Sequence, residues 1–229
     1  MSSDDPDKHT RDLAADAVAA NDPTAWFDRL YVQANEGQAT VPWDHEQPQQ
    51  LLVDWAEQHG ISGHGEPALV IGAGLGRDAE YVAGLGFSTT AFDISETAVE
   101  TARQRHPDST VDYRVANLLE LPPDWLGRFD FVFESLTVQS LPQPPRHTAI
   151  ARVRELLRPG GTLLVVANAR DEGAEVEGPP WPLTPSEVTL FAGDDVTVTA
   201  TERITDDNDP AIQRWRIVCR RSATAATTE

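Results

Sequence analysis

The stretch Pro67-Ala-Leu-Val-Ile-Gly-Ala-Gly-Leu-Gly-Arg-Asp78 joins an apolar run to three alternate glycines and a polar continuation. Residues 68–71 are short and uninterruptedly apolar, which is typical of a parallel strand buried on both faces. Gly72, Gly74 and Gly76 allow a tight backbone turn and the close approach of a ligand where a Cβ atom would clash. The stretch therefore predicts a strand, a nucleotide-binding turn and the start of a helix, although such a turn alone favours ligand binding no more than packing.

Composition limits the possible partners. The chain has 229 residues, 40% of them hydrophobic, which is enough for one α/β domain with one core. The formal net charge is −19, from 37 acidic and 18 basic residues. A field of this sign repels phosphates and anionic lipid surfaces. We therefore expect neither nucleic acid nor a membrane as a partner.

The sequence also indicates a compartment. No apolar stretch approaches the roughly 20 residues that span a bilayer, and the first nine residues lack the basic and apolar segments of a signal peptide. We therefore expect a cytoplasmic protein. Cys219 is the only cysteine, which excludes an intramolecular disulfide and a zinc site built from cysteines, and we expect no metal.

Apolar runs and helical patterns alternate after the opening stretch. This alternation predicts an α/β fold with a doubly wound, mostly parallel sheet and helices on both faces. Two alternating segments near the end predict a C-terminal antiparallel hairpin. Strands are expected at 68–71, 87–92, 111–115, 129–133 and 162–167, the hairpin at 196–204 and 212–219, and helices at 77–85, 95–106, 146–158 and 186–192. Residues 159–161, Pro-Gly-Gly, are expected to form a turn, and the arginines of 146–158 a solvated face.

The chain divides into four predicted parts. Residues 1–20 are an acidic, partly disordered segment, disordered in its first ten residues and helical over 11–20. Residues 21–65 are a helical N-terminal cap, with an Asn-Asp-Pro helix start at 21–23, an aromatic helix and a second helix over 49–59. Residues 66–221 are the ligand-binding core, and residues 222–229 are a tail.

Three of the predicted strands end in residues suited to a ligand, and the first of them ends in the glycines. The carboxyl ends of parallel strands meet at one edge of a sheet, where open α/β folds bind ligands. Asp93 follows the second strand, about 20 residues after the glycines, where a carboxylate can accept both ribose hydroxyls. Capping of the next helix is the alternative role, but Ser95 already fits it. Asn117 and Leu118 follow the third strand, where an amide and an apolar side chain can meet the edge and face of an adenine.

Over about residues 66 to 221 this assembly resembles the class I S-adenosylmethionine-dependent methyltransferases. The resemblance implies S-adenosyl-L-methionine as cofactor and S-adenosyl-L-homocysteine as product. It assigns Gly72, Ala73, Gly74 and Gly76 to the methionine and ribose portions, Asp93 and Ile94 to the ribose and adenine, Asn117 and Leu118 to the adenine, and Glu134 to the methionine end or the substrate.

The sequence departs from the family pattern at two positions. Val70 stands where an acidic residue commonly precedes the first glycine, and Asn117 stands where an aspartate is usual. A subgroup similar to the thiopurine S-methyltransferases and the thiol or halide methyltransferases often lacks the first acid too. The chain resembles that subgroup at Trp26, at Pro42-Trp43-Asp44, at Asp78, at 133–142 and at 178–183.

Aromatic residues are candidates for substrate binding. These are Trp26, Tyr31, Trp43 and Trp181. For Trp26, core packing is as well supported as a place in the site. Trp43 and Trp181 lie in proline-flanked loops that can close over the carboxyl edge of the sheet and exclude water, and aromatic faces attract a sulfonium cation.

The candidate catalytic residues are Glu134, Asp44 and His45. An unpaired carboxylate at the end of a buried strand is costly, so Glu134 is expected to bind the amino group of the cofactor or a substrate proton. Asp44 contacts the methionine portion or caps a turn, with equal support. His45 is a possible general base, although a histidine in a loop is more often only solvated.

We expect methyl transfer to a small-molecule nucleophile by direct in-line displacement, with a thiol or another soft nucleophile as the first choice because it needs no strong base. An oxygen or nitrogen acceptor would need a base. An NAD(P)-dependent oxidoreductase and a non-catalytic nucleotide-binding module are the alternatives. The glycine spacing, the helical segment before the first strand and the closing hairpin favour methyl transfer over a dinucleotide site. The sequence does not predict an oligomeric state.

Overall fold

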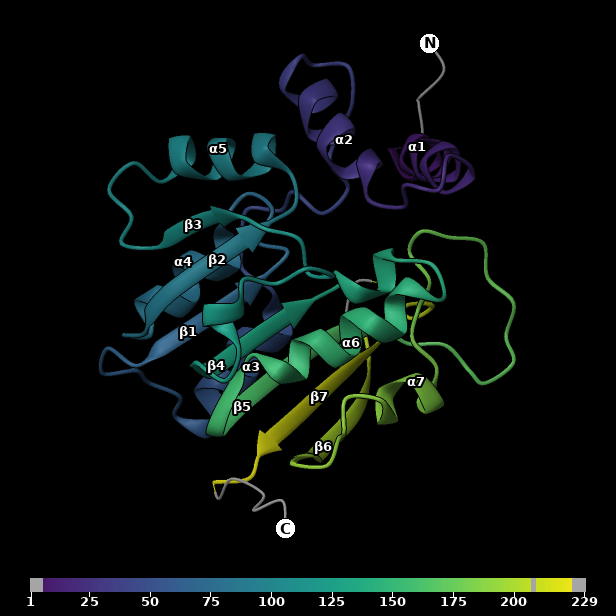
Figure 1. Cartoon of the computed structure of the whole chain (residues 1–229). Coiled ribbons are helices and arrows are strands. Elements are labelled where there is room, and N and C mark those ends of the chain that lie inside the picture. Colours follow the sequence, from purple (N-terminus) through teal and green to yellow (C-terminus); the bar gives the residue numbers. More distant parts are fainter. Residues whose placement is uncertain (1–5, 207–208, 224–229) are drawn as a thin grey trace.

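The structure, a computed structural model, describes residues 6–206 and 209–223, and its centre is a seven-stranded sheet (Figure 1). The strand order is β3-β2-β1-β4-β5-β7-β6. Strands β1 to β5 pair in parallel, and β7 runs antiparallel to both β5 and β6. The strands are β1 (Pro67–Ile71), β2 (Ser88–Asp93), β3 (Asp112–Val115), β4 (Phe129–Ser135), β5 (Leu157–Asn168), β6 (Val196–Thr205) and β7 (Gln213–Arg221).

The helices precede the sheet, connect its strands or lead into the closing hairpin. They are α1 (Pro6–Ala19), α2 (Ala25–Asn35), α3 (Gln50–His59), α4 (Arg77–Gly84), α5 (Glu96–Arg105), α6 (Pro145–Glu155) and α7 (Pro185–Thr189), with two short 3-10 helices, η1 (Pro123–Trp125) and η2 (Val138–Ser140). This confirms the predicted doubly wound sheet and its closing antiparallel strands. Within the described ranges, no helix is both long enough and apolar enough to cross a membrane.

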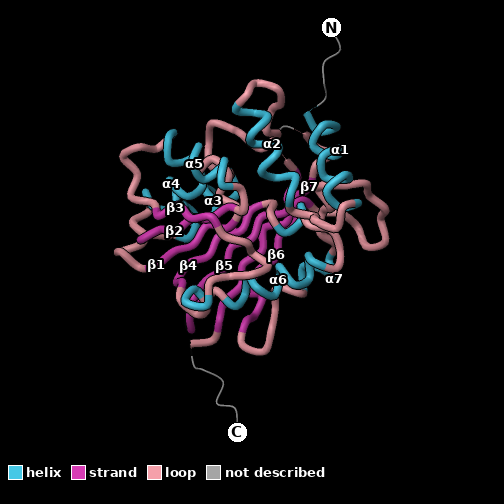
Figure 2. The backbone as a smooth tube through the Cα atoms, turned by 45° about the horizontal axis from the view of Figure 1, so that its top comes forward, coloured by secondary structure: helices cyan, strands magenta, loops and turns pink. Residues whose placement is uncertain are grey.

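Helices cover both faces of the sheet (Figure 2). Side chains of β1 alternate between the faces, as expected for a buried parallel strand. Leu69 and Ile71 pack in the cluster that includes α6 and α7. Ala68 and Val70 pack in the cluster that includes α3, α4 and α5. The strand order reverses between β1 and β4, so the site is expected at the carboxyl ends of these two strands.

The opening stretch folds as the sequence predicts. Gly72, Gly74 and Gly76 have φ angles of 60°, 51° and 95°, in the left-handed region that only glycine adopts without strain. Gly76 is the N-cap of α4. On the next unit, the Ser95 hydroxyl caps α5 by accepting the Ala98 N–H at 2.9 Å, which confirms the predicted cap.

Strand β5 differs from the prediction. Residues 159–161 do not form a turn that precedes the strand, because β5 begins at Leu157 and contains them. Leu157 pairs with Phe129, and the next pair joins Thr162 to Phe131, so the extra residues bulge out of the ladder. Burial of Leu157 keeps the start of the strand in the sheet.

The N-terminal segment also differs. Helix α1 begins at Pro6, so residues 6–10 are helical where disorder was expected. Proline is favoured in the first turn of a helix, and Ala14 and Ala17 bury themselves in the cluster formed with α2. Residues 1–5 and 224–229, parts of the predicted disordered segment and tail, lie outside the described residues. Helix α2 begins at Ala25, two residues beyond the predicted Asn-Asp-Pro start.

The arginine face predicted for 146–158 is wrong at Arg146, which is 2% exposed. Its Nε donates to the Leu141 carbonyl at 2.9 Å, and its Nη1 bonds Glu187 Oε1 at 2.8 Å. Glu187 lies in α7, which packs over the start of α6. A buried guanidinium is tolerated because a carboxylate and a carbonyl satisfy it.

Gly76→Ala tests the backbone requirement of the turn. A Cβ atom at this position would overlap the Tyr113 hydroxyl, and φ is +95°. We expect a loss of about 2–4 kcal/mol in the free energy of unfolding, measured with urea. The matched control is Gly84→Ala in α4, where a Cβ would meet nothing within 4 Å; it should gain about 0.5–1 kcal/mol. Equal effects of the two substitutions would contradict the assigned backbone conformation.

Candidate functional site

The carboxyl ends of β1, β2 and β4 bring the glycine turn between two acidic side chains. Ile71, the last residue of β1, pairs with Phe92 on one side and Glu134 on the other. Gly72 follows Ile71, and a Cβ atom on it would overlap the Thr137 side chain from the loop after β4. Asp93 and Glu134, two of the residues proposed from the sequence, thus lie on the two strands that flank β1.

Asp93 joins the turn to the next helix. Its side chain is buried; Oδ2 accepts the Gly74 N–H at 2.9 Å, and Oδ1 accepts the Ser95 N–H at 3.0 Å. Burial raises the pKa of Asp93, and these N–H groups oppose the rise. Because a carboxylate oxygen can accept more than one hydrogen bond, both oxygens keep acceptor capacity for a ligand.

Sequence reasoning missed Asp28 of α2. The Ser95 hydroxyl donates to Asp28 Oδ1 at 2.7 Å, and the Thr97 N–H donates to the same oxygen at 3.1 Å. Burial acts to raise the pKa of Asp28, but these hydrogen bonds outweigh it and hold the pKa low. Its negative charge contributes to the raised pKa of Asp93. No local signal marks Asp28, because Ser95 lies 67 residues away.

Glu134 is fully buried at the end of β4. Its Oε1 accepts the N–H groups of Thr137 at 2.7 Å and Val138 at 3.0 Å. Its Oε2 is buried and has no hydrogen-bond partner in the part of the chain that the structure describes. Burial raises the pKa of Glu134 to about 7, against the effect of the two N–H groups. An unsatisfied buried acceptor of this kind is suited to a cationic or hydrogen-bond-donating ligand.

Two of the predicted aromatic residues lie at the turn. The Trp43 Nε1–H donates to the Tyr31 hydroxyl at 2.8 Å. A Cβ atom on Gly74 would lie 3.0 Å from the Tyr31 oxygen and 3.9 Å from the Trp43 ring. Burial, with the charge of Asp93, raises the pKa of Tyr31 well above its usual value, so the hydroxyl stays protonated. Trp26 is 1% exposed and stacks on Phe27, which favours its core interpretation.

The adenine candidates lie beside Asp93, since the Ala116 N–H donates to the Asp93 carbonyl at 3.0 Å. The Asn117 side chain accepts the Leu119 N–H at 2.9 Å and so forms a local turn. Leu118 is largely buried in the core cluster. Ala73 and Ile94 are half-buried at their predicted places.

Asp44 and His45 lie in the segment that follows Val41. Both Asp44 oxygens accept from Arg105 of α5, each at 2.9 Å. His45 is exposed. The structure thus gives Asp44 a protein partner that the sequence did not reveal, and the catalytic roles of both residues stay predictions.

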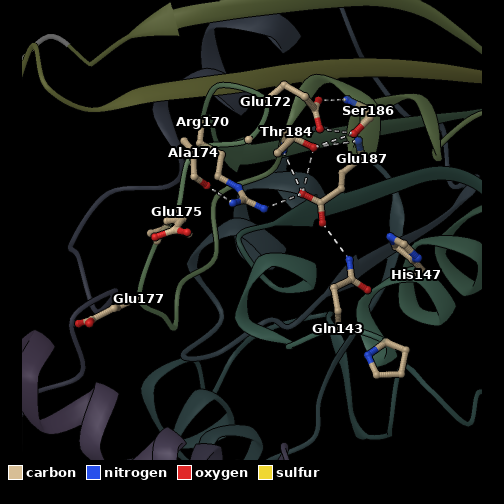
Figure 3. A pocket seen from close by; sticks show the side chains of 13 residues that line it. Gln143, His147, Arg170, Glu172, Ala174, Glu175, Glu177, Thr184, Ser186 and Glu187 are labelled. Atoms are coloured by element: carbon tan, nitrogen blue, oxygen red, sulfur yellow. Dashed lines mark hydrogen bonds and ion pairs between the residues drawn. The ribbon is translucent and has the colours of Figure 1, made fainter.

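The contacts of Trp181 are with Arg146 and Gln139 and not with the glycine turn. The centroid of its ring is 5.7 Å from the Arg146 guanidinium carbon, and its backbone N–H donates to the Gln139 carbonyl at 2.8 Å. Beside α6 and α7 is a cavity of about 990 Å³, drawn in Figure 3. Neither Trp43 nor Trp181 lines it. Its polar lining comes from Gln143, His147, Arg170, Glu172, Glu175, Glu177, Thr184, Ser186 and Glu187.

The residues at the turn fit S-adenosylmethionine. Asp93 offers free acceptor capacity for ribose hydroxyls, and Glu134 Oε2 offers a buried acceptor without a partner. The ammonium group of the methionine portion is a donor that would satisfy this oxygen. The fit rests on these two carboxylates, because Thr137, Tyr31 and Tyr113 already fill the space opened by the glycines.

Solved structures share the fold over nearly the whole chain. One is the Burkholderia thailandensis 1,6-didemethyltoxoflavin-N1-methyltransferase with bound 1,6-didemethyltoxoflavin and S-adenosylhomocysteine, with a TM-score of 0.64 and 19% identity over 94% of this chain and 89% of that one. Another is the [4+2]-cyclase SpnF, with a TM-score of 0.67 and 16% identity over 89% and 96%. At such identities the likeness shows the fold alone.

Residues 69–165 match the family model described as "Methyltransferase domain". The match runs from β1 into β5 and so includes the turn, Asp93 and Glu134. Over this range the chain is similar to a methyltransferase domain, on the fold that the solved structures share.

The curated relatives are similar over part of their length. A ubiquinone biosynthesis O-methyltransferase of Xanthomonas axonopodis pv. citri (strain 306) is 35% identical over 132 residues, 54% of each chain. The protein of the same name from Azotobacter vinelandii is 33% identical over 113 residues, 48% of this chain and 47% of that one. The chain thus spans about half the length of the curated relatives it matches. These relatives do not confirm the predicted thiopurine and thiol or halide subgroup.

Glu134→Gln tests the buried carboxyl. Because the folded pKa is about 7 and the ordinary value is 4.5, the contribution of Glu134 to stability is fully present below about pH 4.5 and is lost as pH rises through 7. The glutamine variant cannot ionise at this position, so its stability does not fall in this pH range for this reason. Relative to wild type, its free energy of unfolding in urea should rise by about 2–3 kcal/mol between pH 4.5 and 8. Parallel stability curves for the two proteins would contradict the raised pKa.

Proposed function

We propose that this protein transfers the methyl group of S-adenosylmethionine to a small-molecule nucleophile. The observation that carries the proposal is the pair of buried carboxylates, Asp93 and Glu134, on either side of the glycine turn. The methyltransferase domain match over the same residues supports it.

Each carboxylate has a distinct proposed role. Asp93 binds the ribose hydroxyls through the acceptor capacity that its two N–H partners leave free. Glu134 Oε2 binds the ammonium group, because Val70 supplies no charge before the turn. Bound cation would lower the pKa of Glu134 and so remove the cost of ionising it in the core. Asn117 and Leu118 receive the adenine.

The positive sulfur of the donor activates its own methyl group, so this chain mainly aligns the reactants and excludes water. Tyr31 and Trp43 lie over Gly74 and provide an aromatic wall beside the turn. A protonated Tyr31 cannot serve as a base at neutral pH, which leaves Glu134, Asp44 and His45 as the candidate bases.

A thiol or another soft nucleophile remains the first proposed acceptor, since it reacts without a strong base. An oxygen acceptor is the second. The relatives named O-methyltransferases support it. Incubation with labelled S-adenosylmethionine and a panel of thiols, halide, phenols and amines separates the two, since label should enter one acceptor class. Label in none of them would contradict a small-molecule acceptor of these classes.

Asp93→Ala tests donor binding. The substitution should raise the Kd for S-adenosylhomocysteine at least about tenfold, about 1.4 kcal/mol, by isothermal titration calorimetry. Asp54→Ala is the control, because Asp54 is exposed on α3 and bonds only Gln50 among the hydrogen bonds recorded for it. Equal affinities of the two variants would give Asp93 a purely structural role.

The same titration distinguishes the alternative classes. Binding of NADH, seen as energy transfer from tryptophan, without binding of S-adenosylhomocysteine would favour the oxidoreductase. Binding of S-adenosylhomocysteine without methyl transfer to any acceptor would favour a non-catalytic nucleotide-binding module. The cyclase among the structural neighbours shows that this fold is not limited to methyl transfer.

A further inference from the structure

A short segment, residues 43–49, crosses from the aromatic wall at the glycine turn to the start of α3. We refer to it as the covering segment. It begins with Trp43, whose indole bonds Tyr31 over Gly74, and ends with Gln49, the N-cap of α3. What holds this segment determines where the aromatic wall lies.

Arg77 and Asp78, the first residues of α4, hold both ends of the covering segment. Arg77 Nη2 donates to the Trp43 carbonyl at 2.7 Å, and Nη1 donates to the Gln47 carbonyl at 2.8 Å. Asp78 Oδ1 accepts the Gln49 N–H at 2.7 Å. Because α4 begins where the glycine turn ends, these bonds fix the segment to the turn itself.

A second attachment runs to α5. The two oxygens of Asp44 bond the two terminal nitrogens of Arg105, each at 2.9 Å. This bidentate geometry is the more specific kind of arginine pairing. The side chains are 30% and 45% exposed, so water screens the pair and leaves it a modest contribution. The covering segment is therefore tied to both helices whose N-termini flank Asp93 and the turn.

We propose that Arg77 and the Asp44–Arg105 pair are positioning residues, which hold the covering segment across the turn so that the donor enters and leaves only when the segment opens. The inference rests on the proposed function, since it assumes a donor at the turn. It gives Asp44 a partner in the protein and not on the donor. The sequence did not indicate Arg105 or Arg77, because Arg105 lies 61 residues from its partner Asp44 and Arg77 lies 34 residues from its partner Trp43.

The test exchanges the charges of the pair in the full chain. D44R and R105D each leave two like charges together, and the double variant restores an opposite pair. Hydrogen exchange of the backbone amides of residues 43–47 and 49 without ligand reports opening, and stopped-flow tryptophan fluorescence reports the dissociation rate of S-adenosylhomocysteine. Each single variant should raise both rates about three- to tenfold, and the double variant should return both to within about twofold of wild type.

Arg77→Gln provides a second measurement, with Arg152→Gln as control, because the Arg152 side chain is 40% exposed on α6. Arg77→Gln should raise the rates of amide exchange and of ligand dissociation, and Arg152→Gln should change neither rate. Urea unfolding of both variants reports whether the core is intact. Weaker binding in D44R that the double variant does not recover would overturn the proposal, because it would make Asp44 a direct ligand of the donor. Unchanged exchange in R77Q and both single variants would also overturn it. Failure of wild type to bind S-adenosylhomocysteine would instead refute the proposed function, and hydrogen exchange would still test the attachment.

Discussion

The buried carboxylate of Asp93 holds together the parts of the site that come from different strands. It accepts one N–H from the turn after β1 and another from the start of α5. Without it, two backbone donors at the edge of the core would lose their partners, which is costly away from water. The left-handed conformation of Gly74 directs its N–H to this carboxylate, so the glycine turn and the acid at the end of β2 form one unit. A ligand that uses Asp93 therefore meets a rigid acceptor.

The parts of the fold that the sequence predicts are those with a local cause. The apolar run of β1, the left-handed glycines and the Ser95 cap depend on residues within a few positions of one another. The misplaced parts depend on distant partners: Leu157 joins β5 by pairing with Phe129, and Arg146 is buried because α7 covers it. The site follows the same division. The predicted strand ends are enough to locate Asp93 and Glu134. In contrast, the pairing of Asp44 with Arg105 and that of Asp28 with Ser95 follow only from the packing of α5.

Glu134, unlike Asp93, has a buried carboxylate oxygen without a hydrogen-bond partner among the described residues. No cation pairs with Glu134 in this part of the chain either. A sequence with an acid in place of Val70 would have a charge on β1 for the same purpose. Placing the acid on β4 instead puts it one strand away, beside Ile71 and against the turn. Burial there raises the pKa of Glu134, and a bound cation would lower it again by stabilising the charged carboxylate.

The most direct test of the account is the titration of Glu134 itself, by carbon-13 NMR of its side-chain carboxyl with and without S-adenosylhomocysteine, assigned with Glu134→Gln. We predict a pKa of about 7 in the free protein and a fall of at least about one unit with the ligand, because an ammonium group then faces the carboxylate. An unchanged pKa in the presence of saturating ligand would contradict the assignment of Glu134 to the donor and leave it a cap of the η2 loop.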